Sequence, residues 1–170
     1  MSTFALDRPV VKTVALDVLL CVAVVAVPAL SHAAAIPLYK LEPMRLLLFA
    51  AILFSSRRNA LLMALWLPLL STLTSGHPVF PKVVLIQAEL AFNAWLFFGL
   101  LHRSKRFVMS AAVSVLASKG IYYATKFVLI KTALLDGDLI ATPWTYQFTA
   151  LSFVLVGGGL VWRVREKKRA

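Results

Sequence analysis

The sequence predicts an all-α integral membrane protein with six transmembrane helices and both termini in the cytoplasm. Apolar residues make up 61% of the 170-residue chain, whereas soluble domains contain roughly 45–50%. The mean hydropathy is +0.85. Only 15% of the residues are charged, yet the net charge is +11 because 18 Lys and Arg stand against 7 Asp and Glu. Six helices of about 20 residues fill about 120 positions, so we expect a single transmembrane domain over residues 1–170.

Each span is expected where an apolar run is bounded by polar, proline or glycine residues. The first could instead be a signal peptide, but Asp17 inside its apolar core favours an uncleaved helix. The second begins at Pro43 and has a short apolar run, and Asn59 is expected to cap the third. A polar loop that includes Asp136 and Asp138 precedes the sixth and is long enough to form a lid. The expected spans are about 14–38, 43–57, 60–75, 83–101, 107–130 and 145–162.

The basic residues are distributed unequally between the two sides of the membrane. Twelve lie on the side of the termini and four on the other, which by the positive-inside rule indicates cytoplasmic termini. Orientation and anionic headgroups therefore explain most of the charge, and we expect the basic tail to bind the bilayer of the cytoplasmic (inner) membrane, not nucleic acid. The twelve are Arg8, Lys12, Arg57, Arg58, Arg103, Lys105, Arg106, Arg163, Arg165, Lys167, Lys168 and Arg169, and the four are Lys40, Arg45, Lys82 and Lys131.

The chain offers little for catalysis or for metal binding. Cys21 is its only cysteine, and its three histidines are expected on opposite sides of the membrane, so a three-histidine metal site is not predicted. The run Ser75, Gly76, His77 lacks the glycine that precedes the nucleophile in serine hydrolases, and a turn explains it better. A phosphate-binding glycine loop is also missing from the sequence. We therefore expect no metal, no cofactor and no enzymatic activity.

Polar side chains within the fourth and fifth spans are the main functional signal. A charged group at the centre of a membrane helix costs about 3 kcal/mol on insertion scales, so its presence there indicates a function or a charged partner. Glu89 and Asn93 share one helix face, and Lys119, Tyr123 and Lys126 share another. Because the two helices run antiparallel, we expect Glu89 level with Lys126 and Asn93 level with Lys119. This predicts an outward-opening pocket whose net positive charge an anionic or zwitterionic solute would balance.

Trp144 and Gln147, at the outer start of the sixth span, are expected to close this pocket by stacking and hydrogen bonding. Two alternatives remain open. Trp144 can be an interfacial aromatic anchor, and Glu89 and Lys126 can form an internal ion pair while Asn93 links helices. The predicted solute contacts are Glu89, Asn93, Lys119, Tyr123, Lys126, Trp144 and Gln147.

Residues 67–81 read LPLLSTLTSGHPVFP and are followed by Ala88-Glu89-Leu90, and the first span closes with Ile36-Pro37-Leu38. These stretches resemble the substrate-binding S components of energy-coupling factor (ECF) vitamin transporters. The resemblance implies capture of a vitamin or related micronutrient in a pocket near the outer face. It also implies docking through small residues of the first helix, here Ala29 and Ala33, onto a transmembrane coupling subunit that carries two ATPase subunits. Packing within this protein is the alternative for these alanines and for the glycines at 157–159.

The expected function is therefore high-affinity binding of a vitamin-like solute for uptake by an ATP-driven ECF-type importer. The main alternative is a non-transporting scaffold, because bacterial rod-shape-determining membrane proteins have a similar size and span number. A scaffold needs no pocket, and in it Glu89 and Lys126 would pair directly. An intramembrane enzyme is a third reading, because polar residues also line such active sites.

Overall fold

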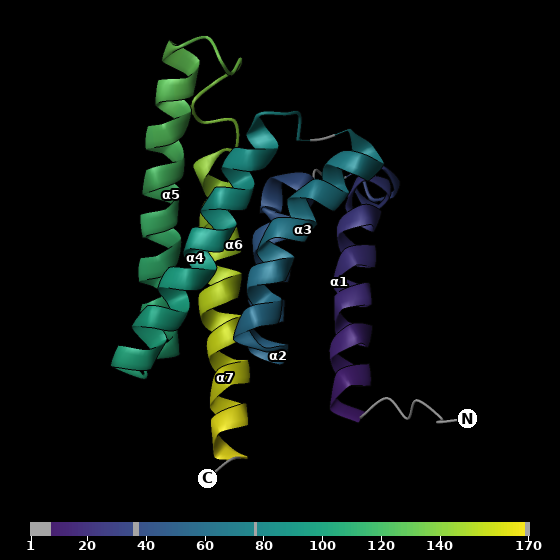
Figure 1. Ribbon diagram of the computed structural model, residues 1–170, viewed down its shortest axis with the longest axis vertical. Coiled ribbons are helices and arrows are strands. Elements are labelled where there is room, and N and C mark those ends of the chain that lie inside the picture. Colours follow the sequence, from purple (N-terminus) through teal and green to yellow (C-terminus); the bar gives the residue numbers. More distant parts are fainter. Residues whose placement is uncertain (1–7, 36–37, 77, 169–170) are drawn as a thin grey trace, which may run out of the picture.

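The computed structural model describes residues 8–35, 38–76 and 78–168, and over these residues the regular structure is entirely helical. The long helices lie side by side along the long axis of the molecule, with α1 at one edge and α5 at the other (Figure 1). The elements are α1 (Arg8–Ala33), η1 (Leu38–Leu41), α2 (Pro43–Phe54), α3 (Arg57–Ser75), α4 (Lys82–Ser104), α5 (Phe107–Lys131), α6 (Trp144–Ser152), η2 (Phe153–Gly157) and α7 (Gly158–Lys167).

Four stretches of the described chain are long and apolar enough to cross a bilayer, which makes this a multi-pass membrane protein. The fourth of them joins α6, the π-helical turn η2 and α7 into one run, at the position expected for the sixth span. Helix α2 is apolar but has only 12 residues, a length of about 18 Å. Helix α3 has 19 residues but opens with Arg57 and Arg58. The four stretches are Val11–Ala33, Lys82–Ser104, Phe107–Lys131 and Trp144–Lys167.

The boundary between the second and third expected spans differs from the sequence prediction. Helix α2 ends at Phe54, three residues early, because Ser55 takes an extended conformation. Ser56 then caps α3, and its hydroxyl accepts a hydrogen bond of 3.2 Å from the backbone N–H of Asn59. Asn59 is therefore not the cap. Its side chain instead donates a hydrogen bond to the Asp17 carboxylate of α1, which gives the acidic group inside that apolar helix a partner.

Successive long helices run in alternating directions, so the start of α1 and the end of α7 lie at the same end of the molecule (Figure 1). We call this end the termini end. The opposite end holds a cavity, and we call it the cavity end. The core of the termini end is aromatic. The Phe97 ring meets the rings of Phe49, Phe98 and Phe107 edge to face, with centroid separations of 5.7, 5.5 and 5.4 Å. Trp162 of α7 stacks on Phe107 at 5.5 Å and so joins α7 to this cluster.

Small residues of α5 and α7 lie where these helices pack against their neighbours. Ser110, Ser114 and Ser118 lie on the buried face of α5, where their hydroxyls bond to backbone carbonyls of the same helix. A Cβ added to Gly158 would lie 2.9 Å from the Phe107 ring, and one added to Gly159 would lie 3.0 Å from Val108. These two glycines therefore serve packing within the protein.

By contrast, Gly157 of η2 is exposed, and a Cβ built on it would meet nothing within 4 Å. Ala29 and Ala33 of α1 are exposed as well. Helix α1 packs on α2 and α3 through buried residues such as Leu20 and Val24, while most of its surface faces outward. Ala29 and Ala33 are thus not buried by packing inside this chain.

Candidate solute-binding site

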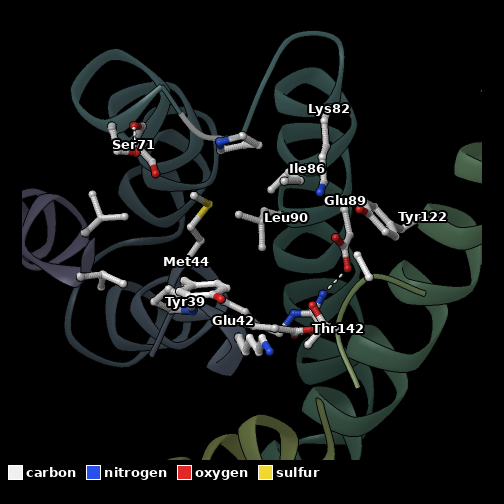
Figure 2. Close-up of a pocket in the computed structure, with 18 of the residues that line it drawn as sticks. Tyr39, Glu42, Met44, Ser71, Lys82, Ile86, Glu89, Leu90, Tyr122 and Thr142 are labelled. Atoms are coloured by element: carbon white, nitrogen blue, oxygen red, sulfur yellow. Dashed lines mark hydrogen bonds and ion pairs between the residues drawn. The ribbon is translucent and has the colours of Figure 1, made fainter. Parts of the chain in front are cut away.

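A cavity of about 1000 Å³ lies at the cavity end of the molecule. Its wall is formed by the last turns of α1, α3 and α5, the first turns of α2 and α4, η1, and the loop between α5 and α6. Met44, Ile86, Leu90 and Tyr122 give it apolar and aromatic surface, and Ser71 of α3 lies across from them (Figure 2). The volume is in the range of pockets that take a small organic ligand.

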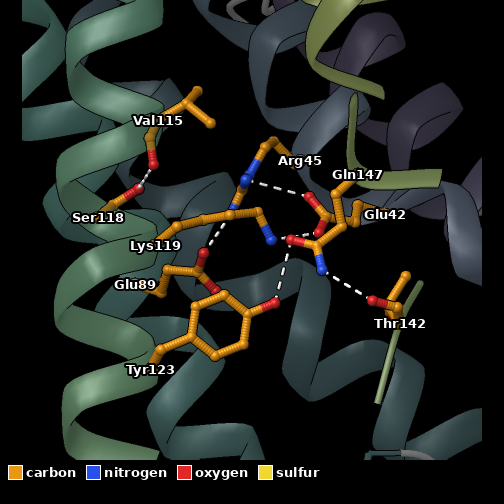
Figure 3. Close-up of polar contacts among 9 residues, drawn as sticks. All are labelled: Glu42, Arg45, Glu89, Val115, Ser118, Lys119, Tyr123, Thr142 and Gln147. Atoms are coloured by element: carbon orange, nitrogen blue, oxygen red, sulfur yellow. Dashed lines mark hydrogen bonds and ion pairs between the residues drawn. The ribbon is translucent and has the colours of Figure 1, made fainter. Parts of the chain in front are cut away.

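Four charged side chains form one connected network on this wall (Figure 3). Arg45 of α2 is bonded to the Glu89 carboxylate of α4, and its other terminal nitrogen lies 3.0 Å from Glu42. Lys119 of α5 pairs with the second oxygen of Glu42. Two carboxylates and two cations therefore balance, and three helices are joined at a place where each charge alone would be costly.

The start of α2 positions the two members of this network that the sequence analysis did not include. Glu42 precedes the helix in a left-handed conformation, with φ of 52°, and Arg45 follows one turn later, so the two side chains share a face. Arg45 is only 4% exposed. Its charge was counted with the four basic residues on the side of the membrane opposite the termini. The spacing of Glu42 and Arg45 at a helix start was a usable signal for an ion pair.

The alternative in which Glu89 and Lys126 form an internal ion pair is wrong. Glu89 pairs with Arg45, not with Lys126, and Lys119 pairs with Glu42. The stripes do share one chamber, because Glu89, Lys119 and Lys126 all line the same cavity. Glu42 and Arg45 extend the expected set of one carboxylate and two amines, and they form a neutral group with Glu89 and Lys119. Lys126 is in none of the ion pairs among the described residues, so positive charge remains in excess on the wall.

Lys126 fixes the loop between α5 and α6. Its side chain is buried, and its Nζ donates hydrogen bonds to the carbonyl oxygens of Asp138 and Leu139, the latter at 2.9 Å. Gln147 of α6 donates from Nε2 to the Thr142 carbonyl at 2.8 Å. Leu139 and Thr142 line the cavity, so the loop that the sequence marked as a possible lid forms part of the wall.

Tyr123 connects this loop anchor to the cavity. Its hydroxyl donates a hydrogen bond of 3.0 Å to Gln147 Oε1, while its ring lies on the cavity wall and under the Lys119 amine. Trp144 contacts the Tyr123 ring at a centroid distance of 6.1 Å but is itself 50% exposed. Gln147 and Trp144 are thus behind the wall, where they support Tyr123 and the loop, and are not among the residues that line the cavity.

Asn93 does not line the cavity either. It lies one turn below Glu89 and is completely buried, and neither its amide nitrogen nor its oxygen has a hydrogen-bond partner among the described residues. Gln87 also points elsewhere, because its Nε2 donates to the Leu65 carbonyl of α3 at 2.7 Å. Of the seven predicted solute contacts, the structure brings Glu89, Lys119, Tyr123 and Lys126 together.

The described residues contain no group of three or more His, Cys, Asp or Glu side chains that could hold a metal ion. His32 lines the cavity, whereas His77 lies outside the described residues. The hydroxyl of Ser75 donates to the Ser71 carbonyl at 2.7 Å in the last turn of α3.

Comparison with known proteins gave no matching family model, no matching curated protein and no matching solved structure.

Proposed function

We propose that this protein is the solute-binding subunit of an ATP-driven importer of the ECF type, and that it captures a vitamin or related micronutrient from outside the cell. The observation that carries the proposal is the cavity of about 1000 Å³ at one end of a membrane-embedded helical bundle. Its wall combines aromatic and apolar surface with a few convergent polar groups, the composition typical of small-molecule sites.

The charge network supports binding over a purely structural role. Glu42, Arg45, Glu89 and Lys119 neutralise one another, so none of these four charges is left unpaired when the cavity holds no solute. Each member still lines the cavity and has hydrogen-bonding capacity to offer a solute. A scaffold would need the ion pairs but not the space between the helices.

The orientation in this proposal has six membrane crossings and both termini in the cytoplasm. The alternating helix directions are compatible with an even number of crossings (Figure 1), and the basic residues concentrate at the termini end. In this orientation the cavity faces outward. The two elements α2 and α3, which are short or polar at one end, would cross where neighbouring helices cover them and the bilayer thins.

Transport would require a partner, because the sequence has no phosphate-binding loop with which to use ATP. In the proposal, exposed small residues of α1 dock on a transmembrane coupling subunit that carries two ATPase subunits. Ala29 and Ala33 are exposed and lie four residues apart, a spacing that lets another helix approach closely. ATP-driven changes in that subunit would then reorient the whole binder and release the solute inside.

The test is to purify the protein gently into lipid nanodiscs and to identify any retained small molecule by mass spectrometry. We expect a vitamin-like compound at about one per protein, with affinity that falls about tenfold or more in Glu89→Gln, a loss of about 1.4 kcal/mol or more. Glu166→Gln, at an exposed position in α7, is the matched control and should bind normally. Absence of any retained compound, together with no binding across a panel of vitamins, would reject the proposal.

A further inference from the structure

Three amines on the cavity wall, those of Lys40, Lys82 and Lys126, have no carboxylate partner among the described residues. The ion pairs among the described residues involve Arg45 and Lys119, but neither Lys82 nor Lys126. Lys82 is the first residue of α4 and lines the cavity, and its side chain extends along the helix in the direction of Glu89 (Figure 2). Lys126 donates two hydrogen bonds to loop carbonyls, so one of the three N–H groups of its ammonium remains available.

Lys82 and Lys126 line the same cavity from two helices that pack against each other, α4 and α5. Asp138, the acidic residue whose backbone carbonyl accepts from Lys126, is exposed on the loop. The first turn of α4 contains no acidic residue and no side-chain cap. A helix N-terminus is itself positive, so a lysine there adds like charge to like. The combination leaves this side of the cavity without the anion that would balance it.

On the rest of the wall, Glu42, Arg45, Glu89 and Lys119 pair among themselves. The Lys40 amine of η1 lies over the Tyr146 ring at 5.8 Å, which leaves its charge without a carboxylate in the described part of the chain. Besides Lys40, the positive charge without an acidic partner there lies at the start of α4 and near the end of α5, where Lys82 and Lys126 line the cavity.

We propose that Lys82 and Lys126 bind the anionic group, a carboxylate or a phosphate, of the solute held in this cavity. The inference rests on the proposed function and names the class of solute: an organic anion whose ring or apolar body lies against Tyr122, Ile86 and Leu90. The neutral network then supplies hydrogen bonds to the polar groups of that body. Lys82 was expected just before the fourth span, outside the membrane, whereas it is the first residue of α4 and lines the cavity.

The experiment measures affinity for matched pairs that differ in one anionic group. The pairs are nicotinate and nicotinamide, lipoate and lipoamide, pantothenate and pantothenol, and pyridoxal 5′-phosphate and pyridoxal, each titrated into the full-length protein in nanodiscs. In at least one pair the anion should bind at least about tenfold more tightly than its neutral partner, about 1.4 kcal/mol. The first three pairs report a carboxylate and the fourth a phosphate, and inorganic phosphate as competitor shows whether the bare anion suffices.

Lys82→Gln removes the charge without touching the loop that Lys126 holds. It should reduce the preference for the anion about tenfold and leave the neutral partner's affinity unchanged, while Lys82→Arg should keep the preference. Lys131→Gln is the matched control, because Lys131 is exposed at the end of α5 and lies over Phe127, outside the cavity wall. It should leave both affinities unchanged.

Two outcomes overturn the inference in distinguishable ways. If neutral partners bind as tightly as the anions, or if Lys82→Gln keeps the full preference, the anion site is wrong while the proposed binding function stands. If no member of any pair binds and nothing is retained on purification, the proposed function fails as well.

Discussion

The cavity end and the termini end of this helical bundle are built on different principles. At the termini end, Phe49, Phe97, Phe107 and Trp162 fill the space between α2, α4, α5 and α7 with ring-to-ring contacts. At the cavity end, α2, α4 and α5 instead surround a cavity of about 1000 Å³ together with α1 and α3, and charged side chains lie on its wall. Tight apolar packing at the termini end therefore holds the helices in position, while the cavity end keeps space and charged groups available for a ligand.

The largest effect is expected from Arg45→Gln, which tests whether the cavity end depends on its charge balance. The change removes the cation between Glu42 and Glu89 and leaves the buried Glu89 and the half-buried Glu42 against Lys119 alone. Breaking a buried ion pair costs about 3–5 kcal/mol. Thermal unfolding in detergent should show a large fall in Tm. Arg103→Gln, at an exposed position near the end of α4, is the control, and an equal Tm for both variants would show that the network contributes nothing.

Gly158→Ala tests the tight packing of the termini end. The new methyl group would lie 2.9 Å from the Phe107 ring, which is fixed between Phe97 and Trp162 and has little room to move. Such overpacking costs about 1–3 kcal/mol. Gly157→Ala has open space around the added methyl and is the matched control. The same unfolding assay should separate the two variants, and identical Tm values would mean that the termini end is looser than described.

A smaller effect is expected at Asn59, the polar link between α1 and α3 on the termini side. Asn59→Ala removes the hydrogen bond to Asp17 and leaves that carboxylate without it. Polar links between membrane helices contribute about 0.6 kcal/mol on average and at most about 1.7. Arg58→Ala is the matched control, because it places alanine at the neighbouring exposed position. The account expects a lower Tm for Asn59→Ala only, and it is contradicted if Arg58→Ala is the more destabilised.

The smallest effect on global stability is expected from Lys126→Gln. This change tests whether Lys126 holds the loop between α5 and α6 in its place on the cavity wall. The loop should lose its two bonds from Nζ, while the anchor from Gln147 to Thr142 remains. Hydrogen exchange followed by mass spectrometry should show faster exchange around Leu139, with little change in α4. Unchanged exchange in the loop would indicate that the lysine does not hold it.

The helical class and the positions of the long helices followed from composition and apolar runs, because those signals are local. The expected spans 83–101 and 107–130 lie within α4 and α5. Polar residues inside these apolar helices also pointed to the correct chamber for Glu89, Lys119 and Lys126. Each of these side chains is costly in a bilayer, which makes it conspicuous in the sequence.

The partners of those residues could not be read from the same signals. Glu42 and Arg45 were missed because Glu42 comes just before the expected second span, and Arg45, in its first turn, was counted with the basic residues of the outer side. The helical periodicity of α4 and α5 does not indicate which third helix packs against them. Asn93 shares a face with Glu89, yet one turn deeper the wall has closed and the residue is fully buried. Depth along α4 decides whether a side chain lines the cavity, as Glu89 does, or is buried below it, as Asn93 is. The depth at which the cavity closes is known only from the three-dimensional arrangement of the helices.

The most direct test is a structure of the protein with its retained solute, determined by cryo-electron microscopy in nanodiscs with a bound antibody fragment. The account predicts density for one organic molecule inside the cavity, with an anionic group within hydrogen-bond distance of Lys82 and Lys126 and its body against Tyr122. Density for the solute at another surface, or a cavity closed by side chains in the solute-bound state, would contradict it.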